Sequence, residues 1–433
     1  MAYLPLSSVW VGLFAVAACA ADFDVRKFGA TPNDGRSDTI ELQATIDAAA
    51  ASGGGRVVLP AGKFDSGALF LKANVELHLE QDAVLAGSQD IADFPRRRTR
   101  IEGHFEEWRP ALVNASGLAG VRITGAGMLD GQGKPYWTAF WKRRAENPKC
   151  TNLEVERPRL MFLENCDGVR IEGITLKDSG FWNLHLYNCR NVQLTGLSIT
   201  APHGDPPQIV GQTQPWDEVS INRAPSSDAI DVDSCQNVRI TKCRISVGDD
   251  CIALKGSKGP LAMSDTSSPP VENILVEDCA FESGHGALTC GSEATLIRNV
   301  VVRNCTVGAA VPLVRLKLRP DTPQRYENLL FEHITLDNAQ ALFDVKPWTQ
   351  FFDLQGHPPQ LSHVRGVIVR DVQGSVRSLG ELRGNAGDTL AGIVLERINL
   401  TAESPKLSIA ESTPLEILEV TVNEVPFQLP INE

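Results

Sequence analysis

Short segments in which apolar and polar residues alternate recur along most of the chain. Four close copies and five looser ones share this pattern: Val121–Gly125, Val169–Gly173, Val192–Gly196 and Val238–Lys242, then copies that begin at Ile274, Val300, Leu329, Val367 and Ile393. Successive side chains of a strand point to opposite faces, so each copy predicts a short strand with one apolar face. The copies at 169 and 192 lie 23 residues apart, and those at 274 and 300 lie 26 apart. A strand repeated at this period predicts a solenoid.

The segments between the copies carry no long helical pattern, which disfavours alternating strand and helix units. We therefore expect an all-β fold, a single-stranded right-handed parallel β-helix, over residues 91–433. The 48 residues from 121 to 169 predict about two coils, and longer gaps hold inserts such as 202–225 and 256–270. An asparagine precedes many copies: Asn191, Asn237, Asn273, Asn299 and Asn328. Because asparagine tolerates the left-handed turn conformation, we expect an asparagine ladder at one corner.

Residues 21–90 predict a small α/β cap at the N-terminal end of the coil. Thr39–Ala51 predicts a helix, with Asp38 as its N-cap and Gly53–Gly55 ending it. Residues 56–60 and 75–79 predict strands. Terminal repeats of a solenoid need such a cover for their open apolar end.

Residues 1–20 predict an export signal, in which an apolar stretch precedes Ala18-Cys19-Ala20. We expect a secreted or periplasmic protein. Val16–Cys19 also has the pattern of a lipoprotein box, so a lipid anchor on Cys19 stays an alternative. After residue 21 no apolar run is long enough to span a bilayer.

The net charge of −12 argues against a nucleic-acid-binding surface but does not exclude an anionic substrate, which local cations would bind. Five of the ten cysteines recur at similar points of the repeat: Cys166, Cys189, Cys235, Cys279 and Cys305. This favours stacked buried thiols over a disulfide framework, which stays open. No C-x-x-C pair is present, so we expect no structural zinc site.

Four polar clusters interrupt the repeat within about ninety residues. They contain Asp228, the pair Asp249 and Asp250, His285 between two glycines, and Arg315 with Lys317. Asp228 precedes Asp249 by 21 residues, close to one coil, so their carboxylates are expected on neighbouring rungs of one face. Asp231 and Asp233 continue the strand after Asp228, and we expect structural roles for them.

These residue types fit hydrolysis of an acidic sugar. Glycoside hydrolysis needs one protonated carboxyl to assist the leaving group and one ionised carboxylate to activate water. Like charges held close together raise the pKa of one member, which supplies the acid. Arg315 and Lys317 are two residues apart on a strand, hence on one face, where they could bind a sugar carboxylate. Calcium binding is the rival role for the acidic cluster.

In this order and spacing, the clusters resemble glycoside hydrolase family 28, the polygalacturonases, over roughly residues 22–400. The resemblance implies a right-handed parallel β-helix, no cofactor and no metal. It implies that Asp249 is the general acid, and that Asp228 and Asp250 hold and deprotonate the attacking water with inversion at the anomeric carbon. His285 would tune the acid or hold the adjacent sugar, and Arg315 and Lys317 would bind a galacturonate carboxylate.

The chain departs from the family pattern at Ser226-Ser227, where Asn-Thr is usual, and at Ala229, where Gly is usual. The tyrosine that often follows the Arg-Ile-Lys strand is not evident, and Trp348 is the nearest aromatic candidate for a sugar platform. The cap and the inserts resemble those of exo-acting members.

We therefore expect a monomeric exo-type α-galacturonidase that acts on homogalacturonan or rhamnogalacturonan fragments. Endo-cleavage is the next alternative. A calcium-dependent pectate lyase and a β-helical carbohydrate-binding protein are the rival classes.

Overall fold

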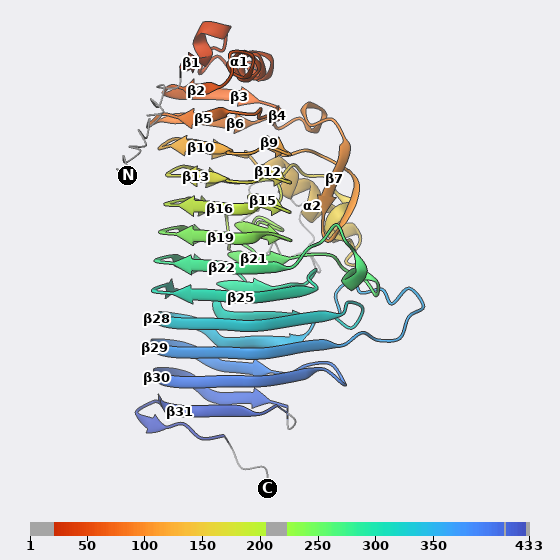
Figure 1. Cartoon of the computed structure of the whole chain (residues 1–433), viewed down its shortest axis with the longest axis vertical. Coiled ribbons are helices and arrows are strands. Elements are labelled where there is room, and N and C mark those ends of the chain that lie inside the picture. The colour runs from red at the N-terminus through yellow and green to blue at the C-terminus, as the bar shows by residue number, and fades with distance from the viewer. Residues whose placement is uncertain (1–20, 205–222, 411–412, 430–433) are drawn as a thin grey trace, which may run out of the picture.

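The computed structural model describes residues 21–204, 223–410 and 413–429. Its strands stack as the rungs of one long coil (Figure 1), and nearly all of them pair in parallel within a single continuous sheet. This is the arrangement of a parallel β-helix, as the repeat predicts. Among the described residues, no helix is long and apolar enough to cross a membrane.

Each coil contributes strands to three columns. Column one contains β1 (Asp22–Asp24), β2 (Gly55–Leu59), β5 (Val75–Leu79), β10 (Arg122–Gly125), β13 (Arg170–Glu172), β16 (Arg190–Thr195), β19 (Gln236–Thr241), β22 (Val271–Glu277), β25 (Leu296–Arg303) and β31 (Leu415–Val422). Column two contains β3 (Gly62–Ser66), β6 (Ala83–Gly87), β11 (Met128–Asp130), β14 (Thr175–Lys177), β17 (Ser198–Thr200), β20 (Arg244–Ser246), β23 (Ala280–Ser283) and β26 (Thr306–Val307).

Column three carries the polar clusters. It contains β4 (Leu69–Phe70), β9 (Val113–Ser116), β12 (Met161–Glu164), β15 (Leu184–Tyr187), β18 (Ile230–Asp233), β21 (Ile252–Lys255), β24 (Leu288–Cys290) and β27 (Pro312–Leu318). The last coils merge the columns into long strands, β28 (Gln324–Pro347), β29 (Ser362–Leu382) and β30 (Thr389–Ile409). The antiparallel strand β32 (Val425–Pro426) folds back on β31.

Apolar side chains stack inside the coil from rung to rung. Ile123, Ile171, Leu194 and Ile240 of column one are each fully buried and lie in register on successive strands. All nine described cysteines are buried and free, as the buried-thiol interpretation predicts, and all but Cys150, which follows α2 in the insert, join this core. Cys19 lies outside the described residues.

The asparagine ladder also forms as expected. The five predicted asparagines adopt φ between 53° and 59°. Side-chain amides donate along the ladder, for example from Asn273 to Asn237 at 3.1 Å and from Asn328 to Asn299 at 3.2 Å.

The helix α1 (Thr39–Ala51) lies over the N-terminal end of the coil (Figure 1), with Leu42, Ile46 and Ala49 buried against it. Asp38 precedes α1, but its carboxylate accepts from the Thr31 amide at 2.8 Å instead of capping the helix. The column-one ladder runs from β2 through β5 to β10 across residue 90. The division into a cap and a catalytic domain stays a prediction.

Two sequence expectations are wrong. Residues 121 and 169 are separated by one coil, because β10 pairs directly with β13. The extra length is an insert that contains α2 (Lys134–Glu146), a helix absent from our expectation. A second insert forms the antiparallel hairpin of β7 (Arg97–Ile101) and β8 (His104–Trp108).

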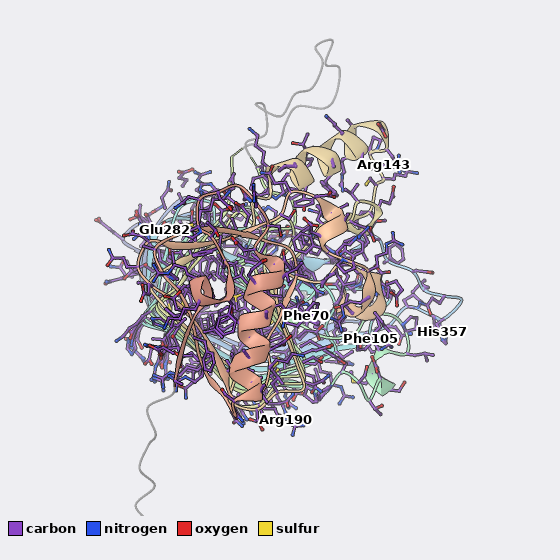
Figure 2. All side chains as sticks on the ribbon, turned by 90° about the horizontal axis from the view of Figure 1, so that it is seen from above. Phe70, Phe105, Arg143, Arg190, Glu282 and His357 are labelled. Atoms are coloured by element: carbon purple, nitrogen blue, oxygen red, sulfur yellow. The ribbon has the colours of Figure 1, made fainter. Side chains whose placement is uncertain are left out.

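Four short 3₁₀ helices complete the described elements: η1 (Val25–Phe28), η2 (Ile91–Asp93), η3 (Asn152–Glu154) and η5 (Ala262–Ser264). Seen along the coil axis in Figure 2, α2 with Arg143, the hairpin with Phe105 and the loop with His357 lie on the side away from Glu282.

Candidate active site

The three candidate carboxylates lie on adjacent rungs of column three, as their spacing predicts. Asp228 stands just before β18, and Asp249 and Asp250 stand just before β21. The Ala229 amide donates to the Asp250 carbonyl at 2.9 Å, which fixes the register of the two turns. One oxygen of each carboxylate lies within 4.8 Å of the others.

Asp250 is held by cations from the next rungs. Its side chain is fully buried, and it accepts from Arg315 Nη1 at 3.1 Å, from Lys317 Nζ at 2.6 Å and from Thr289 Oγ1 at 2.9 Å. Burial alone would raise the pKa of Asp250, but the charges of Lys317 and Arg315 outweigh it and lower the pKa. Asp250 is therefore a carboxylate at neutral pH.

Asp249 has the most exposed side chain of the three, at 26%. His285 Nδ1 lies 3.0 Å from its Oδ1, and Arg223 contacts the other ring nitrogen. An ionised carboxylate can only accept, so Nδ1 donates to Asp249. Burial would raise the pKa of Asp249, but the interaction with His285 outweighs it and lowers the pKa.

Asp228 has a different environment because its charge is poorly compensated. Burial, and then the neighbouring charge of Asp249, raise its pKa to about 7. The opposing cation is Lys255, whose Nζ lies 3.4 Å from Asp228 Oδ2. Asp228 therefore carries a proton in mildly acidic solution.

Lys255 is a site residue for which the sequence analysis proposed no role. Its ammonium also lies 3.4 Å from the buried Asp231, 3.7 Å from Glu293, and 4.6 Å from the centre of the Trp182 ring. The available signal was a lysine that ends the otherwise apolar strand after Asp249-Asp250.

The carboxylate of Asp231 is fully buried, and among the described residues neither of its oxygens has a hydrogen-bond partner. Burial and the nearby charge of Asp228 raise its pKa. Asp233 instead binds Arg100, whose Nε donates to it at 3.0 Å. Asp233 thus ties β18 to the hairpin strand β7, and the structural role expected for Asp231 stays a prediction.

Arg315 and Lys317 share a face of β27, as expected, and both lie beside Trp348. The Trp348 ring centre is 5.5 Å from the Arg315 guanidinium carbon and 4.9 Å from Lys317 Nζ. Arg315 also donates to the His285 carbonyl at 2.8 Å. All seven sequence-predicted site residues therefore gather on one face of the coil.

Six of these residues line a pocket of about 380 Å³, whereas Asp250 is fully buried and contacts the lining residues Arg315 and Lys317. Inserts supply walls that the repeat pattern could not reveal: Trp141 and Arg144 come from α2, Glu102 from the β7–β8 turn, Asn152 from η3, and Phe351 from the loop after β28. The charged lining includes both signs, which suits a ligand that carries a carboxylate and several hydroxyl groups.

The geometry also bears on metal binding. Within the described part of the chain, Asp228, Asp249 and Asp250 could together ligate a cation. Both oxygens of Asp250 are already engaged by Lys317, Arg315 and Thr289, so the cluster holds its compensating charges within the protein.

The β7–β8 hairpin covers column three on the N-terminal side of the pocket. Its buried Arg100 reaches Asp233 of β18, and the Phe105 ring packs edge-on to Tyr187 of β15, 5.5 Å between centres. Beside it, the buried Arg159 lies 2.7 Å from His185 Nδ1. The groove along the coil is therefore filled by protein over β15.

Comparison with known proteins adds to this geometry. The protein-family model described as Glycosyl hydrolases family 28 matches residues 57–419 of the chain. A probable polygalacturonase of Vitis vinifera is 26% identical over a 395-residue alignment that covers 86% of this chain and 74% of the relative.

Two solved structures share the fold. A hyperthermoactive exopolygalacturonase from Thermotoga maritima matches with a TM-score of 0.78 and 24% identity, covering 94% of this chain and 93% of that one. A family 28 exopolygalacturonase from Yersinia enterocolitica matches with a TM-score of 0.72 and 21% identity, covering 93% and 78%.

Proposed function

The chain belongs to glycosyl hydrolase family 28 and is a polygalacturonase-type hydrolase, and we propose that it releases single galacturonate units from one end of pectic chains. Homogalacturonan and rhamnogalacturonan fragments are the candidate substrates. Both present the sugar carboxylate that Arg315, Lys317 and the other pocket cations would recognise.

The observation that carries exo action is the filled groove over β15. A chain bound across the catalytic carboxylates would meet the hairpin at Arg100 and Phe105 on that side. An endo-acting enzyme needs a groove that is open at both ends. In the other direction, an open hollow lies along column three beside Asp344 and Lys346, where the rest of the polysaccharide would lie.

We assign the general acid to Asp249, as the family resemblance implies, because it lines the pocket and has the most exposed side chain of the three carboxylates. His285, Lys317 and Arg315 hold its pKa low. A substrate carboxylate bound to Arg315 and Lys317 would offset their charge and so raise the pKa of Asp249.

Asp250, held ionised by two cations, and Asp228 after loss of its proton would then bind and deprotonate the attacking water. Inversion rests on family membership rather than on the spacing of the carboxylates. Their closest oxygens lie within 4.8 Å, whereas carboxyl groups of inverting enzymes are typically about 6.5–9.5 Å apart. The anomeric configuration of the first product, followed by proton NMR, tests this step directly: a retained configuration would refute it.

We also propose that residues 1–20, which lie outside the described residues, direct export to the cell exterior or periplasm. Processing after Ala20, established by mass spectrometry of the mature protein, would support this. A lipid found on Cys19 would contradict this proposal and indicate that the protein is anchored to a membrane.

Exo action is tested by comparing viscosity with reducing ends during digestion of polygalacturonic acid. Exo-hydrolysis predicts that reducing ends accumulate while viscosity hardly changes. A steep early fall in viscosity would instead support endo-cleavage. Absorbance from unsaturated products, lost in EDTA, would point to a lyase.

A further inference from the structure

A second pocket lies on column three beyond the hairpin. It encloses about 210 Å³, and its floor is formed by Phe70, Asn114 and Phe162, which lie in register on β4, β9 and β12. The same register continues from Phe162 to His185 and Asp231, next to the catalytic carboxylates. The second pocket and the catalytic pocket are therefore two parts of one face, separated by the hairpin.

Cations dominate the rim of the second pocket. Lys72, Arg97 and Arg98 line it, against the single carboxylate Glu164, which accepts from Ser116 Oγ at 2.8 Å. Lys72 is 3.8 Å from Asp47, a long and exposed ion pair worth little.

The two arginines are held by aromatic rings rather than by acids. Arg97 stacks over Phe70 at 4.7 Å and Arg98 over Phe105 at 4.2 Å, measured from the guanidinium carbon to the ring centre. In the parts of the chain that the structure describes, neither forms an ion pair with a carboxylate. A guanidinium that stacks by its face keeps its N–H edge available for a bidentate contact with a carboxylate.

We propose that this pocket is a second binding site for acidic polysaccharide, in which the two stacked arginines bind a uronate carboxylate. The ligand class rests on the proposed pectic substrate. A protein of net charge −12 is repelled by a polyanion, so a local cationic site would offset this repulsion and keep the enzyme on the polymer.

The occupant is a separate chain segment from the one being hydrolysed. Arg100, Phe105 and Arg159 fill the face between the two pockets, so one continuous chain cannot cross from one to the other along column three. The second pocket therefore affects retention on long or aggregated polymer and leaves turnover of a short substrate unchanged.

The test uses the full-length protein in affinity electrophoresis through gels that contain polygalacturonic acid, with neutral galactan gels as reference. The test variant is Arg97→Ser with Arg98→Ser. The matched control is Arg325→Ser with Arg377→Ser, which removes the same charge from exposed positions on β28 and β29. Turnover of digalacturonate is measured for each protein.

We expect the test variant to bind the acidic gel about tenfold more weakly than the wild type, from the loss of two charge-assisted contacts. The control should bind as the wild type does, and neither variant should change digalacturonate turnover by more than about twofold.

Unchanged retention of the test variant would overturn the proposal. So would equal weakening of test variant and control, because it would indicate a net-charge effect, or equal weakening on neutral galactan. Retention in the gel measures binding and does not depend on hydrolysis. If the protein binds through Arg97 and Arg98 but releases no galacturonate, the proposed exo-hydrolase is wrong, whereas the second binding site is supported.

Discussion

At the scale of single residues, the catalytic carboxylates differ because their partners differ. Asp250 has two cations within 3.1 Å, Asp249 has an imidazole at 3.0 Å, and Asp228 shares one ammonium with two other acids. The sequence located all three aspartates, because each interrupts the repeat. It did not distinguish their protonation, which depends on Lys255 and on burial that only the fold creates.

Replacing Asp249 with asparagine should abolish turnover while leaving substrate binding almost intact. The amide keeps the shape of the side chain but cannot deliver a proton, and general acid catalysis contributes about 10²–10⁴-fold. Steady-state kinetics on trigalacturonate, together with calorimetric binding, measures both quantities. Asp130→Asn, on column two, serves as the control. A variant with wild-type turnover would refute the acid assignment.

Replacing Lys255 with methionine should move the acid limb of the pH–activity profile to higher pH. Lys255 lowers the pKa of Asp228, so its removal leaves Asp228 protonated to a higher pH and delays formation of the base. The measurement is kcat/KM against pH, with Lys406→Met at an exposed position of β30 as the control and Lys255→Arg as the conservative variant. If the maximum of kcat/KM falls but the acid limb stays at the same pH, Lys255 has a purely structural role.

Replacing Asp228 with asparagine should stabilise the protein at alkaline pH. The folded-state pKa of Asp228, about 7, lies above its ordinary value of 3.8. The wild type therefore loses stability as pH rises from about 4 through 7, because the folded state must release a proton that it binds more tightly than the unfolded state does. The variant has no such loss, so its advantage in Tm should grow across this window and level off above it. A constant difference in Tm from pH 4 to 9 would contradict the shifted pKa.

At the scale of elements, the inserts rather than the coils shape the site. The hairpin and α2 supply walls of the catalytic pocket, yet neither shares the repeat pattern. α2 is as long as the predicted α1, but it begins after Gly133 with no capping side chain and has no acidic residue in its first turn. The sequence anticipated inserts at 202–225 and 256–270. Residues 205–222 lie outside the described residues, whereas 256–270 contributes Lys258 to the pocket.

The hairpin should depend on the buried Arg100–Asp233 pair. Arg100→Met alone leaves an uncompensated buried carboxylate and should destabilise the fold by about 3–5 kcal/mol. Adding Asp233→Asn should recover part of this loss, because no buried charge then lacks a partner. Denaturant unfolding of both single variants and the double variant gives the coupling energy. Strictly additive effects would show that the pair does not anchor the hairpin.

At the scale of the whole molecule, the repeat made the fold predictable. Alternating segments such as Val192–Gly196 specify both the strand and its buried face, and the recurring asparagines mark the turns. The number of coils was misjudged between 121 and 169, because an insert of one coil's length has the same spacing as a second coil. Which cations face which acids could not be read from spacing, since this depends on the register across several coils.

The asparagine ladder offers a global test of this repeat. Asn273 adopts φ 59°, a conformation that costs a residue with a Cβ about 1–2 kcal/mol unless its side chain compensates. Asn273→Ala should therefore lose more stability than Asn273→Gly, although both lose the same side-chain bonds to Asn237 and Asn299. Thermal unfolding gives the Tm of both variants. A lower Tm for Asn273→Gly than for Asn273→Ala would mean that backbone strain at this position does not determine stability.

The most direct test of the central claim is the time course of products released from polygalacturonic acid and from rhamnogalacturonan oligosaccharides, with and without EDTA. We predict saturated monogalacturonate from the first turnovers, unaffected by EDTA, and the preferred polymer will identify the backbone. An early ladder of oligomers, or unsaturated products that disappear in EDTA, would contradict an exo-acting hydrolase.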